Sequence, residues 1–141
     1  MNRLQAWLLP LHVTLLALVI PDVSRWLPLQ SLLRLFTPQE SGWPYVGMSA
    51  DQILGVIERR LRDPWRMRGR RCLRSGLLAF YFLRRAGIPA VLHFGVYATG
   101  QTRDQAHCWL TLDGRILADP PGERHVLVLT WPACEILTQR I

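Results

Sequence analysis

Three residues in the second half of the chain have the types that thiol-dependent hydrolases and transferases use: Cys72, His107 and Asp119. A thiol nucleophile needs a base that takes its proton, and the base needs a partner that holds it in the right tautomer. A cysteine, a histidine and an aspartate supply these three roles. The residue types therefore predict covalent catalysis at Cys72, provided that the fold brings the three side chains together.

Cys72 falls near the start of a predicted buried helix. Every residue over 77–83 is apolar, which is too continuous for a surface helix and too long for an ordinary strand. Gly69 can cap the start of this helix, whereas Gly87 and Pro89 mark its end. We expect Cys72 near position N3, where unpaired backbone N–H groups and the positive end of the helix dipole favour a thiolate.

His107 lies on a predicted strand whose side chains alternate. His107 and Trp109 share one face, whereas Cys108 points to the other. The Asp113-Gly114 pair is a strong hairpin signal. The predicted strands span Ala90–Tyr97, Gln105–Leu112, Arg115–Asp119 and Arg124–Trp131.

The length of the hairpin loop decides whether Asp119 can reach His107. A two-residue loop at 113–114 would leave Asp119 on the wrong face. A three-residue loop over 112–114, with Gly114 in the left-handed conformation of a bulge, would set residue 107 directly opposite residue 119. Opposed side chains have Cβ atoms about 5 Å apart, within reach of an imidazole–carboxylate hydrogen bond. We predict the three-residue loop.

The first third of the chain indicates helices separated by prolines. They are predicted over Leu11–Ile20, closed by Pro21, over Pro28–Phe36, and over Ser49–Arg62 with a Ser49/Gln52 capping box. Residues 4–20 are apolar, but this segment is shorter than a membrane span and contains Pro10 and His12. For this segment we favour a buried or interfacial helix. A transmembrane helix, with its membrane contact, is the less favoured alternative.

With 141 residues, half of them apolar, the chain predicts one compact domain over 1–141. Within it we expect a helical part over 1–62 and a catalytic core over 63–132. The odd number of cysteines argues against a disulfide framework and favours a reducing, cytoplasmic location. Zinc-ligand spacings are missing and nothing like a P-loop occurs, so we predict neither a metal nor a cofactor.

The net charge of +7 comes from 17 arginines without any lysine. A genomic codon bias explains such a composition as well as selection for an acidic partner does. Eight arginines nevertheless crowd the approach to Cys72, where they would attract an acidic peptide or protein; they are Arg59, Arg60, Arg62, Arg66, Arg68, Arg70, Arg71 and Arg74. No nucleic-acid recognition module accompanies them, so we predict no nucleic-acid partner.

Simpler interpretations apply to each residue alone. A cysteine on a buried helix is most often a small core residue, and a strand histidine is usually structural. His93 and His125 are rival bases, but neither has an acid placed to orient it. Cys108 and Cys134 are interpreted as packing residues.

Two segments together resemble a known family. They run from Trp65 to Val96, with the cysteine near a helix start, and from Ala106 to Gly114, which reads A-H-C-W-L-T-L-D-G. This combination is similar to the lasso peptide biosynthesis B2 proteins, within the transglutaminase-like superfamily of cysteine proteases. The likeness extends to about Asp119, and family members usually have a small residue such as alanine in place of Cys108.

The resemblance implies a papain-like or transglutaminase-like α+β fold, in which the cysteine-bearing helix packs on a small antiparallel sheet. It also implies a leader peptidase, with Cys72 as nucleophile, His107 as base and Asp119 as orienting acid. The implied partners are a precursor peptide, a separate leader-binding protein of the B1 type and the macrolactam cyclase. Candidate residues for binding substrate or partner are Trp65, Arg70, Arg71, Arg74 and Trp109.

Two other classes of function stay open at this point. The fold can serve as a non-catalytic module that binds a peptide or protein, in which case the Cys72 thiol would react no faster than an ordinary cysteine. The same three residues can also transfer an acyl group to an amine instead of water, which the mass of the product would reveal.

Overall fold

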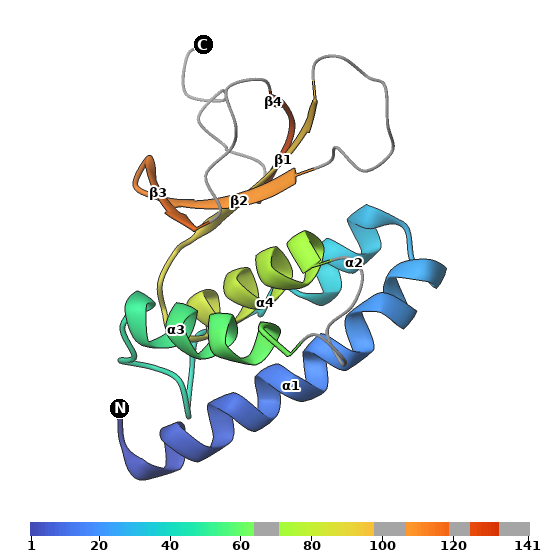
Figure 1. Cartoon of the computed structure of the whole chain (residues 1–141). Coiled ribbons are helices and arrows are strands. Elements are labelled where there is room, and N and C mark those ends of the chain that lie inside the picture. Colours follow the sequence, from blue (N-terminus) through green and yellow to red (C-terminus); the bar gives the residue numbers. More distant parts are fainter. Residues whose placement is uncertain (64–70, 98–106, 119–124, 133–141) are drawn as a thin grey trace. The chain divides into compact units, whose positions relative to one another are not determined.

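The structure, a computed structural model, describes residues 1–63, 71–97, 107–118 and 125–132. The chain divides into two compact units, Met1–Ala90 and Val91–Ile141. In the described residues the first unit holds four helices and the second a four-stranded antiparallel sheet (Figure 1). The fold class is therefore α+β, as the sequence predicts. That one domain spans 1–141 stays a prediction.

Helix α1 (Arg3–Trp26) is much longer than the sequence suggests. The prediction that Pro21 closes a helix begun at Leu11 is wrong, because α1 continues through both Pro10 and Pro21. A proline inside a helix costs about 3 kcal/mol. One face of α1 is buried from Leu9 to Ile20, and burying each large aliphatic side chain contributes about 1.5–3 kcal/mol. The core contacts therefore outweigh the prolines.

The other three helices follow the predictions closely. They are α2 (Leu29–Leu35), α3 (Ala50–Leu61) and α4 (Arg71–Arg85). Ser49 and Gln52 form the predicted capping box of α3. After α4, Gly87 adopts a φ of 88°, and the N–H groups of Gly87 and Ile88 donate to the carbonyls of Arg84 and Leu83. This Schellman arrangement confirms that glycine ends the helix.

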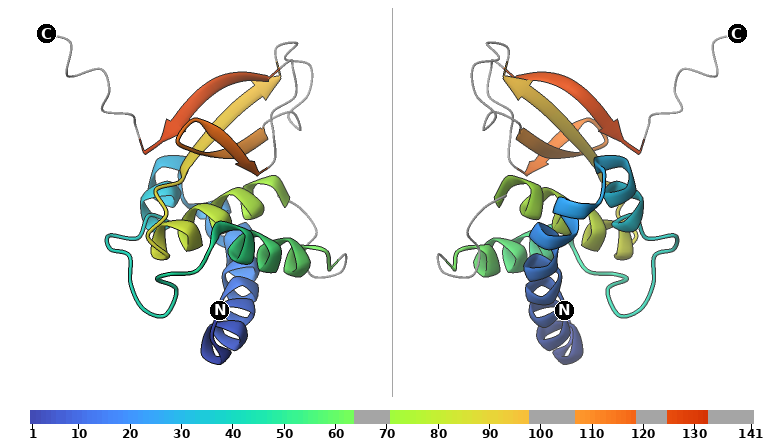
Figure 2. Two further views of the ribbon diagram at one scale, coloured as in Figure 1. Left: turned by 90° about the vertical axis from the view of Figure 1, so that its left-hand side faces the viewer. Right: turned by 90° about the vertical axis from the view of Figure 1, so that its right-hand side faces the viewer.

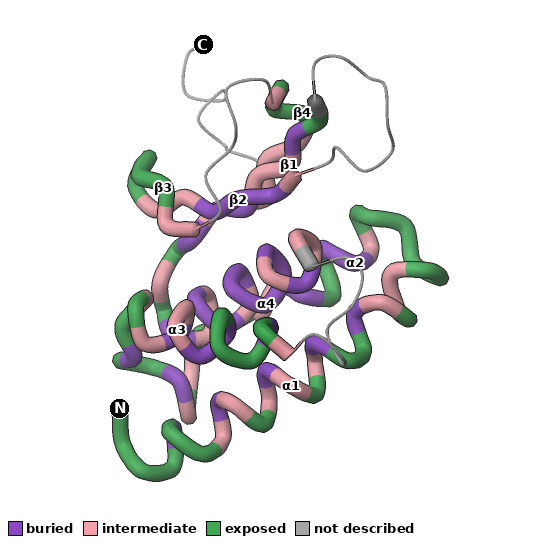
Figure 3. The backbone as a smooth tube through the Cα atoms, viewed as in Figure 1, coloured by how far each residue is buried: buried purple, intermediate pink, exposed green. Residues whose placement is uncertain are grey.

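The core of the helical unit lies where α3 and α4 pack against α1, side by side in Figure 1. Buried and exposed residues alternate along α1 with the period of a helix (Figure 3). The buried side chains come from one face of α1 and of α3 but from nearly the whole circumference of α4; they are Leu9, Val13, Ala17 and Ile20 of α1, Ile53, Val56, Ile57 and Leu61 of α3, and Leu77, Leu78, Phe80, Phe82 and Leu83 of α4.

An aromatic cluster joins α1 to α4 and to the segment that precedes α3. The ring of His12 lies 5.0 Å from that of Phe82 and 5.9 Å from that of Tyr81, between centroids. The Nδ1 atom of His12 forms a 2.9 Å hydrogen bond with the hydroxyl of Tyr45. Burial lowers the pKa of His12, with Arg85 adding to the effect, and burial raises the pKa of Tyr45 to about 12.

The sheet has the strand order β3-β2-β1-β4, and every described pair is antiparallel. Its strands are β1 (Val91–Tyr97), β2 (His107–Leu112), β3 (Arg115–Ala118) and β4 (His125–Trp131). Both views of Figure 2 show the long strand β1 between β2 and β4. The predicted strands are confirmed within the described residues, which exclude 98–106 and 119–124.

The predicted three-residue loop of the β2–β3 hairpin is wrong. Leu112 pairs with Arg115, so the loop has two residues, and Asp113 and Gly114 both adopt positive φ values of 50° and 78°. This turn matches the right-handed twist of the strands, which explains why it is preferred. An irregularity occurs instead one pair further along, because Thr111 pairs with Ile116 but Leu110 pairs with Ala118.

Candidate active site

Cys72 is the second residue of α4, so it lies in the first helical turn, as predicted. Backbone N–H groups in this turn have no partner within the helix, and they favour negative charge. The first turn contains no acidic residue that would oppose a thiolate. Cys72 is half-buried, and the helix behind it becomes fully buried over 76–80. The position therefore suits a reactive cysteine supported by a rigid helix.

Four aromatic or imidazole rings form a row on one face of the sheet, which we call the ring row: His93, Trp109, His107 and His125. The ring of Trp109 stacks on His93, with centroids 5.5 Å apart, and on His107, 6.2 Å apart. The ring of His125 lies 5.2 Å from that of His107. The row confirms that His107 and Trp109 share a face, and it holds His107 between two other rings.

Gly95 of β1 makes room for the ring row. It pairs with His107 on one side and with Leu127 on the other. A Cβ atom at this position would lie 2.9 Å from the indole of Trp109 and 3.0 Å from the carbonyl oxygen of Val126. Both distances are shorter than van der Waals contact, so a side chain here would displace the indole or the strand.

His93 is held as a structural residue. Its Nδ1 atom bonds to the hydroxyl of Thr130 at 3.1 Å and its Nε2 atom to that of Thr111 at 2.7 Å. Both ring nitrogens are thus occupied by hydroxyl groups, which can donate or accept as a neutral imidazole requires. Burial lowers the pKa of His93 and keeps it neutral. These contacts remove His93 as a rival base.

The comparison with protein families places the chain. Residues 14–129 match the family model described as the transglutaminase-like superfamily. The chain belongs to this superfamily. A search of curated proteins and a search of solved structures found no match.

The superfamily match includes all three residues of the predicted triad, Cys72, His107 and Asp119. Cys72 lies in the helical unit and His107 in the sheet unit, and the placement of one unit relative to the other is not determined. Asp119 lies outside the described residues. The contact of Cys72 with His107, and that of His107 with Asp119, therefore stay predictions.

The residues predicted to bind substrate or partner meet different outcomes. Trp65 and Arg70 lie outside the described residues, as does the side chain of Arg71. Arg74 is only 4% exposed, and burial lowers the pKa of its guanidinium. Trp109 is buried in the ring row. Its observed contacts support His107, and its role in substrate binding stays a prediction.

His125 is the residue whose place beside His107 the sequence does not reveal. Its strand can be predicted from alternation, but its neighbours depend on which strand pairs with β1. His107 pairs with Gly95 of β1 and His125 pairs with Tyr97, two residues further along the same strand, so their rings meet across β1. Among the described residues, no group of three or more His, Cys, Asp or Glu side chains is arranged to hold a metal ion.

Proposed function

We propose that this protein is a cysteine peptidase that removes the leader from the ribosomally made precursor of a lasso peptide. The observation that carries the proposal is the superfamily match, which spans both the cysteine in the first turn of α4 and the histidine at the start of β2. The choice of substrate comes from the motif likeness of residues 65–96 and 106–114 to the B2 proteins.

In this mechanism the Cys72 thiolate attacks the carbonyl carbon at the junction of leader and core peptide. His107 accepts the thiol proton and passes it to the leaving amine, which releases one fragment and leaves an acyl group on Cys72. Water, deprotonated by His107, then hydrolyses the thioester and restores the thiol. Backbone N–H groups of the first turn of α4, that of Cys72 included, would stabilise the oxyanion.

Asp119 is proposed to orient His107, and the shift in the β2–β3 pairing between Leu110 and Thr111 is what keeps this role open with a two-residue loop. Ala118, the last described residue of β3, opposes Leu110. Side chains alternate along a strand, so a strand continued by one residue would set Asp119 opposite Trp109, on the face of the ring row. An aspartate there would be a diagonal neighbour of His107.

The proposed partners follow from the proposed reaction. They are the precursor peptide, a separate leader-binding protein of the B1 type and the macrolactam cyclase that acts on the released core. A catalytic thiolate needs reducing conditions, which agrees with the expected cytoplasmic location.

The test is incubation of the purified protein with a candidate precursor, with and without the leader-binding protein, followed by mass spectrometry. Cys72→Ala and His107→Ala should each lower the cleavage rate by at least about a thousandfold. Cys108→Ala is the control for loss of a thiol, because Cys108 is a buried cysteine on β2 that lies on the face opposite to His107. It should cleave at close to the wild-type rate.

Two results would show that the protein has a different function. Cleavage by Cys72→Ala at the wild-type rate would exclude the mechanism. Hydrolysis leaves a carboxylate at the new end of the acyl fragment. An amide at that end would show that the acyl group is transferred to an amine.

A further inference from the structure

Helix α1 has a second apolar face, opposite to the one that enters the core. We call it the outer stripe; its residues are exposed and recur every three or four positions, and they are Leu4, Trp7, Leu11, Leu15 and Leu18. Residues with this spacing are neighbours along one side of a helix. Figure 3 shows green segments repeating along α1 between the buried ones. In the most apolar stretch of α1, only 22% of the residues are buried, whereas the core helix of a soluble protein is mostly buried.

The ends of α1 carry the residues that favour a membrane surface. Trp7 is 67% exposed and Trp26, the last residue of the helix, is 86% exposed. Tryptophan prefers the boundary between headgroups and acyl chains. Arg3 and Arg25 flank the helix, and no charged residue lies between Arg3 and Asp22. An apolar stripe bounded by tryptophan and arginine fits a lipid surface better than bulk water.

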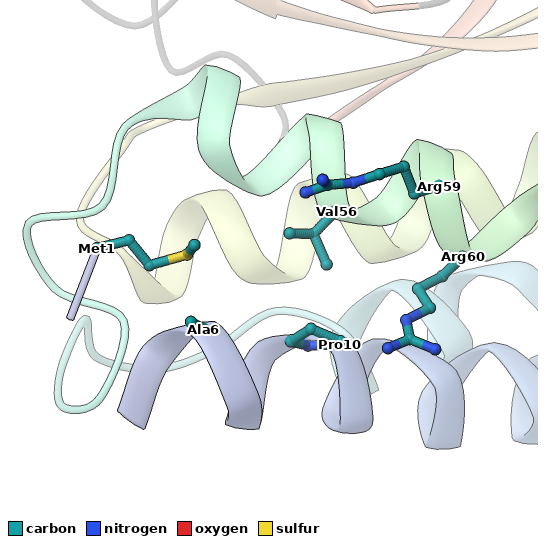
Figure 4. Close-up of a pocket in the computed structure, with 6 residues that line it drawn as sticks. All are labelled: Met1, Ala6, Pro10, Val56, Arg59 and Arg60. Atoms are coloured by element: carbon teal, nitrogen blue, oxygen red, sulfur yellow. The ribbon is translucent and has the colours of Figure 1, made fainter. Parts of the chain in front are cut away.

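A basic groove runs beside the outer stripe. It has a volume of about 450 Å³ and is lined by Met1, Ala6 and Pro10 on one side and by Val56, Arg59 and Arg60 of α3 on the other. In Figure 4 the side chain of Arg60 reaches from α3 toward α1. Pro10 is three residues from Trp7 and next to Leu11, so the groove borders the stripe. Its guanidinium groups can meet the phosphates of anionic lipids.

The packing of α1 argues against a membrane-spanning position, although the helix is long and apolar enough to cross a bilayer. Leu9, Val13, Ala17 and Ile20 have no exposed surface, because they form part of the core of the helical unit. The buried Gln5 donates from Nε2 to the carbonyl of Pro44 at 2.7 Å. A helix that crossed the bilayer would lose all of these contacts, whereas one that lies in the interface keeps them.

A second copy of the chain is a poorer occupant of the outer stripe. A symmetric pair brings the same surface together twice, so an antiparallel pairing of two α1 helices would set Arg3 of one copy near Arg25 of the other. Arg59 and Arg60 would add like charges beside the contact, with Asp22 as the acidic residue of this helix. Anionic lipid would instead attract these positive charges. We therefore infer that α1 binds in the plane of an anionic bilayer through the outer stripe.

The experiment is sedimentation of the full chain with vesicles of phosphatidylcholine, alone or with about one third phosphatidylglycerol. The protein should sediment with the anionic vesicles far more than with the neutral ones, and added salt should weaken the binding. Leu11→Gln with Leu15→Gln should weaken binding by at least about tenfold, because each leucine loses apolar contact with lipid. Circular dichroism checks that the helices persist.

Matched variants separate the stripe from general apolar exposure. Leu127→Gln with Val128→Gln changes two exposed apolar residues of β4 and should bind like the wild type. Arg59→Gln with Arg60→Gln should weaken binding to anionic vesicles by about tenfold or more and leave the neutral ones unchanged.

Three outcomes would overturn the inference: no sedimentation with anionic vesicles, equal binding by the stripe and control variants, or retention in the membrane after an alkaline carbonate wash, which would mean a spanning helix. None of these measurements depends on peptidase activity.

Discussion

In the helical unit His12 lies among aromatic rings, whereas in the sheet unit His93 lies between two threonine hydroxyls. The ring of His12 meets Phe82 edge-on, and its Nδ1 atom bonds to Tyr45. Both nitrogens of His93 are bonded, and its ring stacks on Trp109. Burial lowers the pKa of both imidazoles. The helical unit packs a half-buried histidine against aromatic rings, and the sheet unit includes one in an ordered row of rings.

This difference indicates what each unit would contribute to the proposed active site. In the helical unit the rings of Tyr45, Tyr81 and Phe82 fill a core that supports α4, and α4 carries Cys72 at its start. In the sheet unit the ring row supports a half-buried histidine, His107, on one face. The helical unit makes α4 rigid by filling a core with rings, and the sheet unit orients its side chains by ring stacking and hydrogen bonds.

The largest expected effect tests the core of the helical unit. Phe82 is fully buried, so Phe82→Ala should lower the free energy of unfolding by about 3–5 kcal/mol, because it removes a ring and leaves a cavity. Thermal or urea unfolding measures the loss. Trp26→Ala, at an exposed position, is the control and should stay within about 0.5 kcal/mol of the wild type. Equal losses would mean that the cluster is not a packed core.

A smaller effect is expected from glycines in the two units. Gly95→Ala should destabilise the protein by about 1–3 kcal/mol, because the new methyl group meets Trp109 and the backbone of Val126. The near-ultraviolet circular dichroism should change with the indole. On the proposed function, leader cleavage should also fall by about tenfold or more, since His107 loses its stacking partner.

Gly55 of α3 is the matched control for Gly95. It lies inside a helix, and nothing lies within 4 Å of a Cβ atom placed there. Gly55→Ala should therefore stabilise the protein by about 0.5–1 kcal/mol, because alanine loses less backbone entropy on folding. If both variants were stabilised, the close approach of Trp109 to Gly95 would be contradicted.

The smallest effect concerns pH. The ordinary pKa of histidine is 6.5, and burial lowers the pKa of His12 and of His93 in the folded state. The folded protein then binds fewer protons than the unfolded chain, so stability is complete above pH 6.5 and falls as the pH drops below it. Because both side chains are partly exposed, each contributes less than about 1 kcal/mol.

Titration of the imidazole resonances by nuclear magnetic resonance checks the direction for each histidine. His93→Gln should make the unfolding midpoint less sensitive to pH between 7 and 5. Thr111→Val separates hydrogen bonding from burial, because it removes the hydroxyl at Nε2 while the stacking on Trp109 persists. A pKa of His93 above 6.5 in the folded protein would contradict the neutral assignment.

Much of the fold could be predicted because the signals are local. The capping box of Ser49 and Gln52, the glycine after α4 and the alternation of the strands each act within a few residues. The two failures have different causes: core contacts outweigh a local helix breaker in α1, and the β2–β3 hairpin follows the local turn preference that the prediction set aside. Pro10 does not interrupt α1, because the buried face of the helix lies on both sides of it, from Gln5 to Ile20; α1 also continues through Pro21 to Trp26, although no residue of that last part is buried. The loop at 113–114 adopted the turn that fits the strand twist, and the bulge moved along the hairpin.

The sequence by itself determined the residue types of the site and the elements that hold them. It placed Cys72 at a helix start and His107 on the face of Trp109, since both depend on helical and strand periods that a linear pattern reveals. Only the tertiary structure decided the strand order that sets His125 beside His107, the close approach that Gly95 permits, and the outward exposure of the second apolar face of α1. Those features depend on which segments meet, and pairing between distant segments leaves no local trace in the chain.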